Sequence, residues 1–146
     1  MVLPNHILGV ALMDDDHARL EALLSRVGDT QDEALPALLT EIETETRAHF
    51  RREEDLMRAR EAPILHCHVV QHELFLSRFS NAHEAVKTGD MQRLRHFLGS
   101  VLPGLLEDHV NTVDRVTAGF LRMDDPARSA GPVCLPGEPE LRARRS

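Results

Sequence analysis

Apolar residues recur at intervals of three and four along most of this chain, the spacing that gathers side chains on one face of an α-helix. This periodicity predicts four helices, at about residues 14–27, 32–60, 64–88 and 91–122. Short segments with glycine, proline or aspartate separate them, so successive helices are expected to run in opposite directions. The sequence therefore predicts an all-α fold, an up-down-up-down antiparallel four-helix bundle with an N-terminal arm and a mobile C-terminal tail.

The two ends of the chain do not share this periodicity. Pro4 and Gly9 interrupt residues 1–13, which are predicted to form an arm that lies against the domain. Residues 123–146 contain four prolines and no helical repeat, so a disordered or loosely docked tail is expected there. The bundle itself is assigned to residues 14–122.

One proline lies inside the fourth predicted helix. Pro103 has no backbone N–H, and its ring collides with the carbonyl group one turn earlier. The helix is therefore expected to kink, or to loosen by a turn, near Pro103.

Composition and charge limit the partners of the chain. The formal charge of −7 excludes a strongly basic face, so no nucleic-acid partner is expected. The apolar run at residues 7–13 is too short to cross a bilayer, and no signal peptide is visible, so neither a membrane span nor secretion is predicted. Cys67 and Cys134 are far apart and indicate no disulfide framework. The sequence predicts a reducing, cytoplasmic location.

Histidines and carboxylates interrupt the apolar faces of the predicted helices. His49 and Glu53 are four residues apart on the second helix, and His68 and His72 are four apart on the third. Side chains at this spacing stack on the same helix face, so each pair can reach one metal ion in the bundle interior. His17 supplies one further imidazole from the first helix.

The fourth helix carries His109 and Asp114, which are five residues apart. This spacing corresponds to about 140° around an ideal α-helix, so simple stacking does not bring both side chains to one ion. Either the two side chains straddle the site, with Asp114 bridging two metal ions, or the helix is locally distorted.

Each pair alone is a weak signal, because surface helices often carry such pairs. All four helices contribute, however, and the polar side chains lie on the apolar faces. A buried imidazole or carboxylate without a partner costs several kcal/mol or becomes neutral. A purely structural role for all seven residues is therefore disfavoured. Five imidazoles with two carboxylates suit iron, and seven ligands are too many for one ion.

These motifs resemble those of the hemerythrin family in its bacterial single-domain form. The resemblance covers about residues 10–122. It rests on an Asp-x-x-His-like entry at His17, on His49-Phe50-x-x-Glu53-Glu54, on Pro63 followed by His68-x-x-x-His72, and on His109-x-x-x-x-Asp114. The resemblance implies a non-heme centre of two iron ions, joined by an oxo or hydroxo bridge.

The same resemblance implies unequal ligand sets for the two ions. One iron would have three imidazole ligands, from His68, His72 and His109. The other would have two, from His17 and His49, and would keep an open position for dioxygen. Glu53 and Asp114 would bridge both ions.

An oxygen pocket is also implied by the resemblance, with an apolar lining from Leu105, Leu106, Val110 and Phe50. Two positions depart from the family pattern. Relatives often have Trp where this chain has Leu105, and an aromatic residue where it has Ala62. The pocket is therefore expected to admit solvent more easily, which affects the lifetime of an oxygenated state and not iron binding.

Three functions are compatible with this pattern. The leading hypothesis is reversible dioxygen binding for sensing, storage or delivery (oxygen transport). The second is a di-iron oxidase, a peroxidase or a nitric-oxide-handling enzyme, and the third is an iron- or redox-responsive interaction domain. Di-iron oxidases of the ferritin type use about four carboxylates. Two carboxylates stabilise high-valent iron less, which favours oxygen binding, and the lack of tyrosine excludes a tyrosyl-radical mechanism. The sequence specifies no protein partner.

Overall fold

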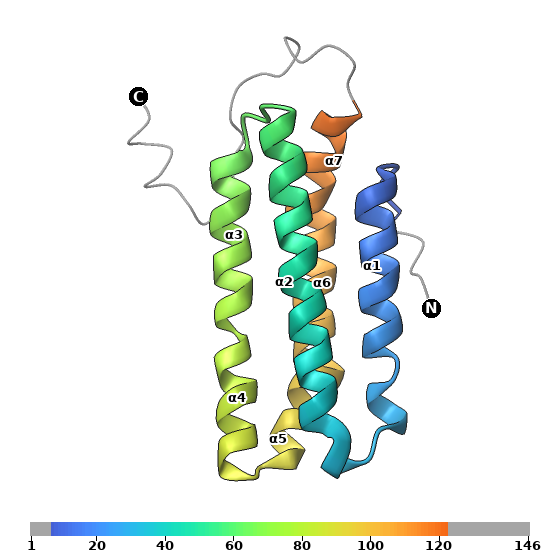
Figure 1. The fold of residues 1–146 in the computed structure, drawn as a ribbon, viewed down its shortest axis with the longest axis vertical. Coiled ribbons are helices and arrows are strands. Elements are labelled where there is room, and N and C mark those ends of the chain that lie inside the picture. Colours follow the sequence, from blue (N-terminus) through green and yellow to red (C-terminus); the bar gives the residue numbers. More distant parts are fainter. Residues whose placement is uncertain (1–6, 123–146) are drawn as a thin grey trace.

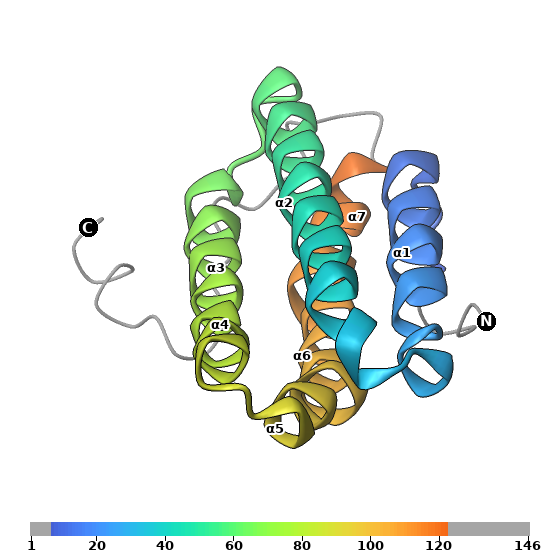
Figure 2. The ribbon, with the colours of Figure 1, turned by 60° about the horizontal axis from the view of Figure 1, so that its bottom comes forward.

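The structure is a computed structural model that describes residues 7–122. Within these residues, four helical rods pack side by side in antiparallel order (Figures 1 and 2). The first rod is α1, Ala11–Leu24, and the second is α2, Leu35–Ala59. The predicted tail and Cys134 lie outside the described residues, so the boundaries proposed for arm and tail stay predictions.

The third and fourth rods are each assembled from several stretches. The third consists of α3, Leu65–Ser77, and α4, Phe79–Thr88. The fourth contains α5, Met91–His96, a π-helical turn, Phe97–Val101, α6, Leu102–His109, a second π-helical turn, Val110–Asp114, and α7, Arg115–Leu121. Two 3₁₀ turns, Val27–Asp29 and Asp32–Ala34, join α1 to α2. The four-helix bundle expected from the periodicity is confirmed.

Helix α1 begins at Ala11, three residues before its predicted start at about residue 14. Asp14 lies in the first turn, where its carboxylate accepts hydrogen bonds from the N–H groups of Leu8, at 2.8 Å, and Gly9, at 3.0 Å. Negative charge is favoured in this turn by the helix dipole. Asp14 therefore ties the preceding segment to the start of the helix.

The connection between α4 and α5 is tight because of two residues. Gly89 has a φ of 76°, a left-handed conformation that glycine adopts without a steric penalty. Asp90 then caps α5, since its side chain accepts a hydrogen bond of 3.1 Å from the N–H of Arg93. These two residues reverse the direction of the chain, so that the fourth rod runs antiparallel to the third.

Pro103 stands directly after an irregular stretch of the fourth rod. The π-helical turn Phe97–Val101 precedes it, and Pro103 lies in the first turn of α6. A proline is tolerated in the first turn of a helix, where its missing N–H costs little. The expected loosening of the helix near Pro103 is confirmed.

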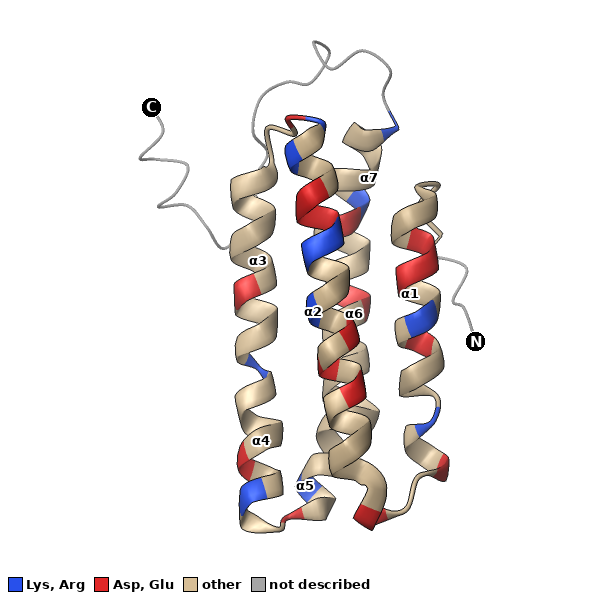
Figure 3. Ribbon diagram, in the orientation of Figure 1, with Lys and Arg blue, Asp and Glu red and all other residues tan. Residues whose placement is uncertain are grey.

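The bundle core is apolar at the level of α4 and α5 and polar further along. Its most deeply buried apolar side chains include Leu38, Leu39, Ile42, Phe79, Leu94 and Leu98. Cys67 is also buried. Acidic and basic residues recur along α1 and α2 (Figure 3). None of the described helices is both long and apolar enough to cross a membrane.

Core packing predicts the effect of truncating Leu98, which is 0% exposed. The substitution Leu98→Ala should lower the free energy of unfolding by about 2–5 kcal/mol, because it removes buried methyl groups and leaves a cavity. The matched control is Leu74→Ala, since Leu74 is 55% exposed and its truncation should change stability by less than about 0.5 kcal/mol. Urea denaturation of both variants measures the difference. Equal effects of the two substitutions would contradict the packing described.

Candidate metal centre

Two buried carboxylates lie at the middle of the polar cluster, and each divides its oxygens between two groups of histidines. Glu53 projects from α2 and is 1% exposed. Its Oε1 lies 3.1 Å from Nε2 of His72 and 3.3 Å from Nε2 of His68. Its Oε2 faces the other way and lies 3.1 Å from Nε2 of His49. Glu53 therefore contacts imidazoles on both sides of the bundle.

Asp114 repeats this arrangement from the fourth rod, where it is fully buried. Its Oδ1 lies 3.1 Å from Nε2 of both His68 and His109. Its Oδ2 lies 2.9 Å from Nε2 of His17. The two carboxylates therefore face the same two groups of imidazoles.

All seven residues singled out in the sequence meet at this place. Their ligand atoms form two overlapping sets, each within 4.8 Å. One set holds three imidazoles and both carboxylates, from Glu53, His68, His72, His109 and Asp114. The other holds two imidazoles and the same carboxylates, from His17, His49, Glu53 and Asp114.

The fourth rod brings His109 and Asp114 together by changing its winding. Residues Val110–Asp114 form a π-helical turn, in which hydrogen bonds run from residue i to i+5. A spacing of five residues then corresponds to about one turn, so Nε2 of His109 and Oδ1 of Asp114 lie 3.1 Å apart. Asp114 also reaches His17 on α1. The spacing left open either a local distortion of the helix or side chains that reach to both sides of the site. The structure shows the helix distortion, and Asp114 also reaches both groups of histidines.

The donor atoms fit metal ions better than they fit one another. Six buried side-chain atoms of the described residues lack a hydrogen-bond partner, and all belong to this cluster: Nδ1 of His17, Nε2 of His49, His68 and His109, Oε2 of Glu53 and Oδ1 of Asp114. Several of these atoms approach one another at 3.1 Å without the orientation of a hydrogen bond. Neighbouring ligands of one first-row ion at about 2.1 Å are about 3 Å apart. The cluster is a metal-binding site.

In the metal-free cluster, the buried carboxylates and the adjacent imidazoles shift one another's pKa values. Burial would raise the pKa values of Glu53 and Asp114, but the adjacent imidazoles hold both pKa values well below their usual range. Burial would lower the pKa of His68, but the carboxylates of Asp114 and Glu53 outweigh it and raise that pKa from 6.5 to about 9. The pKa of His72 is lowered, chiefly by burial. In the metal-free protein, a proton on His68 therefore offsets part of the buried negative charge.

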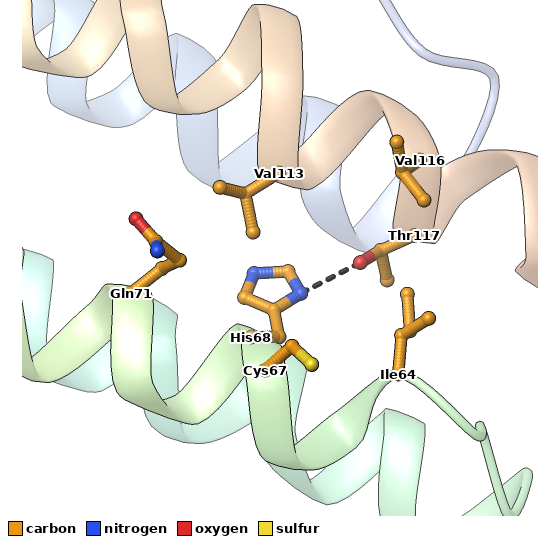
Figure 4. A pocket seen from close by; sticks show the side chains of 7 residues that line it. All are labelled: Ile64, Cys67, His68, Gln71, Val113, Val116 and Thr117. Atoms are coloured by element: carbon orange, nitrogen blue, oxygen red, sulfur yellow. Dashed lines mark hydrogen bonds between the residues drawn. The ribbon is translucent and has the colours of Figure 1, made fainter. Parts of the chain in front are cut away.

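Three of the imidazoles are held from behind by a second polar group. The Nδ1–H of His68 donates to Oγ1 of Thr117 at 2.6 Å, beside a small cavity lined by α3 and α7 (Figure 4). That of His72 donates to Glu54 at 2.7 Å. That of His49 donates to Asp16 at 3.0 Å. Such partners fix the tautomer and the orientation of a metal-binding imidazole.

Sequence reasoning missed Asp16 and Thr117 as parts of the site. Asp16 lies outside the histidine and carboxylate pairs of the sequence, and Thr117 is a single threonine without a motif. One signal was present for Asp16, because it lies within the first predicted helix directly before His17. His66, by contrast, is exposed.

The predicted oxygen-pocket residues occupy different surroundings. Phe50 stacks on His72, with ring centroids 3.7 Å apart, and Leu106 and Val110 are buried in the core. Leu105 instead lines a groove of about 220 Å³ that opens to solvent and has His109 in its wall. Solvent can therefore reach Leu105 through this groove, which lies beside the group of three histidines.

Fold and ligand set together define a four-helix-bundle protein with a buried histidine–carboxylate metal centre. The chain matches the family model of the hemerythrin HHE cation binding domain over residues 8–121. It is 30% identical over 119 residues to a bacteriohemerythrin of Ralstonia nicotianae, with 82% of this chain and 86% of the relative covered. No solved structure gives a significant match. The chain belongs to the hemerythrin family, and the resemblance of its motifs to that family is confirmed.

The raised pKa of His68 predicts how the stability of the metal-free protein depends on pH. The folded state binds the His68 proton more tightly than the unfolded state, so this stabilisation is present below about pH 6.5 and is lost as the pH rises through about 9. The free energy of unfolding of the metal-free protein should therefore fall across this interval. Denaturation series at several pH values measure the slope, and His68→Gln should reduce it. A stability that rises from pH 6.5 to 9 would contradict the assignment.

Proposed function

We propose that the seven side chains hold two iron ions and that the protein binds dioxygen reversibly at this centre, for sensing, storage or delivery. The observation that carries the proposal is the division of both carboxylates between a group of three imidazoles and a group of two. The groups share Glu53 and Asp114, so they differ by one imidazole. The group formed by His17 and His49 has one ligand fewer, which leaves room for a small molecule.

The chemistry of the donor set supports oxygen binding. Two ferrous ions, when bound, supply the electrons that dioxygen binding requires. Neutral imidazoles outnumber carboxylates by five to two, whereas oxygen-cleaving bundle enzymes use about four carboxylates. Membership of the hemerythrin family and the relative named bacteriohemerythrin support the same function. A cytoplasmic location remains a prediction from the sequence.

Apolar side chains pack against several of the imidazole rings. Phe50 lies nearly parallel to the ring of His72 and also contacts those of His49 and His109, with centroids 5.5 and 5.3 Å away. Val110, next to His109 in the chain, is 0% exposed. A dry, apolar surrounding of this kind limits proton entry, which reversible binding of dioxygen requires.

The groove at Leu105 favours a second candidate function, a di-iron oxidase, a peroxidase or a nitric-oxide-handling enzyme. Arg78, Asp108 and Thr112 are exposed residues that line this groove, and His109 lies in its wall. Solvent and small polar molecules can therefore approach a ligand imidazole from outside. Turnover requires such access, whereas long storage of dioxygen is impaired by it.

Metal content separates the roles of the ligands. Wild-type protein loaded anaerobically should contain two irons per chain. Glu53→Ala should lose both irons, because Glu53 faces both groups of imidazoles. His17→Ala should lose one iron, because His17 belongs to the two-histidine group only. Iron analysis after gel filtration measures the ratio, and melting temperatures should fall with metal loss.

The control for metal content is His66→Ala, because His66 is exposed and should not affect iron. One ion in the wild-type protein, or the retention of both ions by Glu53→Ala, would contradict the two-ion assignment.

Stopped-flow mixing of the ferrous protein with dioxygen tests the function itself. Reversible binding should give charge-transfer absorption that disappears when dioxygen is removed, against a low protein background because the chain has no Trp or Tyr. Leu105→Trp should fill part of the groove and lengthen the lifetime of the oxygenated form. Repeated turnover with peroxide or nitric oxide, without a reversible oxygenated form, would support the enzyme candidate instead.

A further inference from the structure

Asp16 is a buried acid that the set of seven ligands does not include. It is fully buried on α1, directly before His17. Its Oδ2 lies 3.0 Å from Nδ1 of His49 on α2, while Nε2 of the same ring lies 3.1 Å from Oε2 of Glu53. The imidazole of His49 is therefore held at one nitrogen and presented to the metal centre at the other.

Two arginines neutralise the Asp16 carboxylate. Arg52 donates to both of its oxygens, from Nε at 2.9 Å and from Nη2 at 2.8 Å, and Arg19 donates to Oδ1. Both arginines also contact Glu45, which is partly exposed and does not touch Asp16 or His49, at 2.7 Å from Arg52 and 3.4 Å from Arg19. Such partners stabilise a buried carboxylate. Both Asp16 oxygens accept hydrogen bonds from guanidinium groups, so the contact of Oδ2 with His49 requires the proton of that ring to be on Nδ1.

The two imidazole groups differ in how they are held. In the three-histidine group, His68 donates to the hydroxyl group of Thr117, and His72 donates to Glu54, which is partly exposed. In the two-histidine group, Nδ1 of His17 has no hydrogen-bond partner among the described residues. The orientation of the two-histidine group therefore depends on the contact between Asp16 and His49.

We propose that Asp16 is a positioning residue for the two-histidine half of the metal centre. Asp16 fixes the tautomer of His49 that leaves Nε2 free to bind metal, and Arg52 holds the Asp16 carboxylate in place. The loss of such a partner typically lowers metal affinity by about 10–100-fold. The inference rests on the proposed function only in requiring two metal ions, because it does not depend on dioxygen.

A purely structural role makes a different prediction. If Asp16 only joined α1 to α2 through ion pairs, its replacement would loosen the bundle and weaken both metal ions together. If Asp16 positions His49, the ion bound by His17 and His49 is weakened selectively. The distinction requires a measurement that resolves the two ions.

The test compares Asp16→Asn with Glu45→Gln in the full-length protein. Asparagine has nearly the same shape as aspartate but can turn its amide N–H toward Nδ1 and stabilise the wrong tautomer, as Asp→Asn does beside other functional histidines. Competition between the zinc-loaded protein and a chelator measures the affinity of each ion. Asp16→Asn should weaken one ion by about 10–100-fold and leave the other unchanged. Glu45→Gln keeps the contact between Asp16 and His49, so it should leave the affinities for both ions unchanged.

Nitrogen NMR of the zinc-loaded protein provides a second readout that a structural role would not change. Wild-type His49 should carry its proton on Nδ1, and Asp16→Asn should lower the population of that tautomer. Equal weakening of both ions, unchanged affinity for both, or the same selective loss in Glu45→Gln would overturn the proposal.

Should Asp16→Asn fail to fold, Arg52→Gln tests the same contact while keeping the carboxylate. It should weaken the same ion, by less than Asp16→Asn would, and unchanged affinities would count against the proposal. Failure of the proposed function would appear separately: the protein would bind two metal ions, but its iron-loaded form would not bind dioxygen.

Discussion

Two negative charges lie in the interior of this bundle, and the rest of the structure depends on how they are compensated. Glu53 and Asp114 are almost fully buried, where an isolated carboxylate is strongly destabilised. Each carboxylate directs one oxygen to two imidazoles of the three-histidine group and the other oxygen to the two-histidine group. The imidazoles reduce the cost, but several of their nitrogens have no hydrogen-bond partner. Bound metal ions would satisfy the remaining atoms, and part of the metal-binding free energy would then be folding free energy.

The helices supply this geometry by two kinds of backbone winding. Regular α-helix places His49 beside Glu53 on α2 and His68 beside His72 on α3, because residues four apart share a face. The fourth rod needs a π-helical turn to do the same for residues five apart. In addition, Thr117, Glu54 and Asp16 each hydrogen-bond to Nδ1 of one imidazole, on the side of the ring away from the metal centre. The ligands are therefore positioned by local winding, and their rings are oriented by contacts between helices.

The parts of this account that are local in sequence could be predicted, and the parts that depend on contacts between helices could not. Periodicity predicted the four rods, and the i,i+4 pairs predicted most of the ligand set. The spacing of His109 and Asp114 left two geometries open, because sequence does not show where a helix changes its winding. The contact of Asp16 with His49 spans 33 residues, and that of His68 with Thr117 spans 49. No local pattern encodes such contacts.

The most direct test of the central claim is anomalous diffraction from crystals of the iron-loaded protein. The account predicts two iron peaks about 3.5–4 Å apart, with Glu53 and Asp114 each contributing one oxygen to each ion. One ion should contact the rings of His68, His72 and His109, and the other those of His17 and His49. A single peak, or two peaks that do not share the carboxylates, would contradict the account.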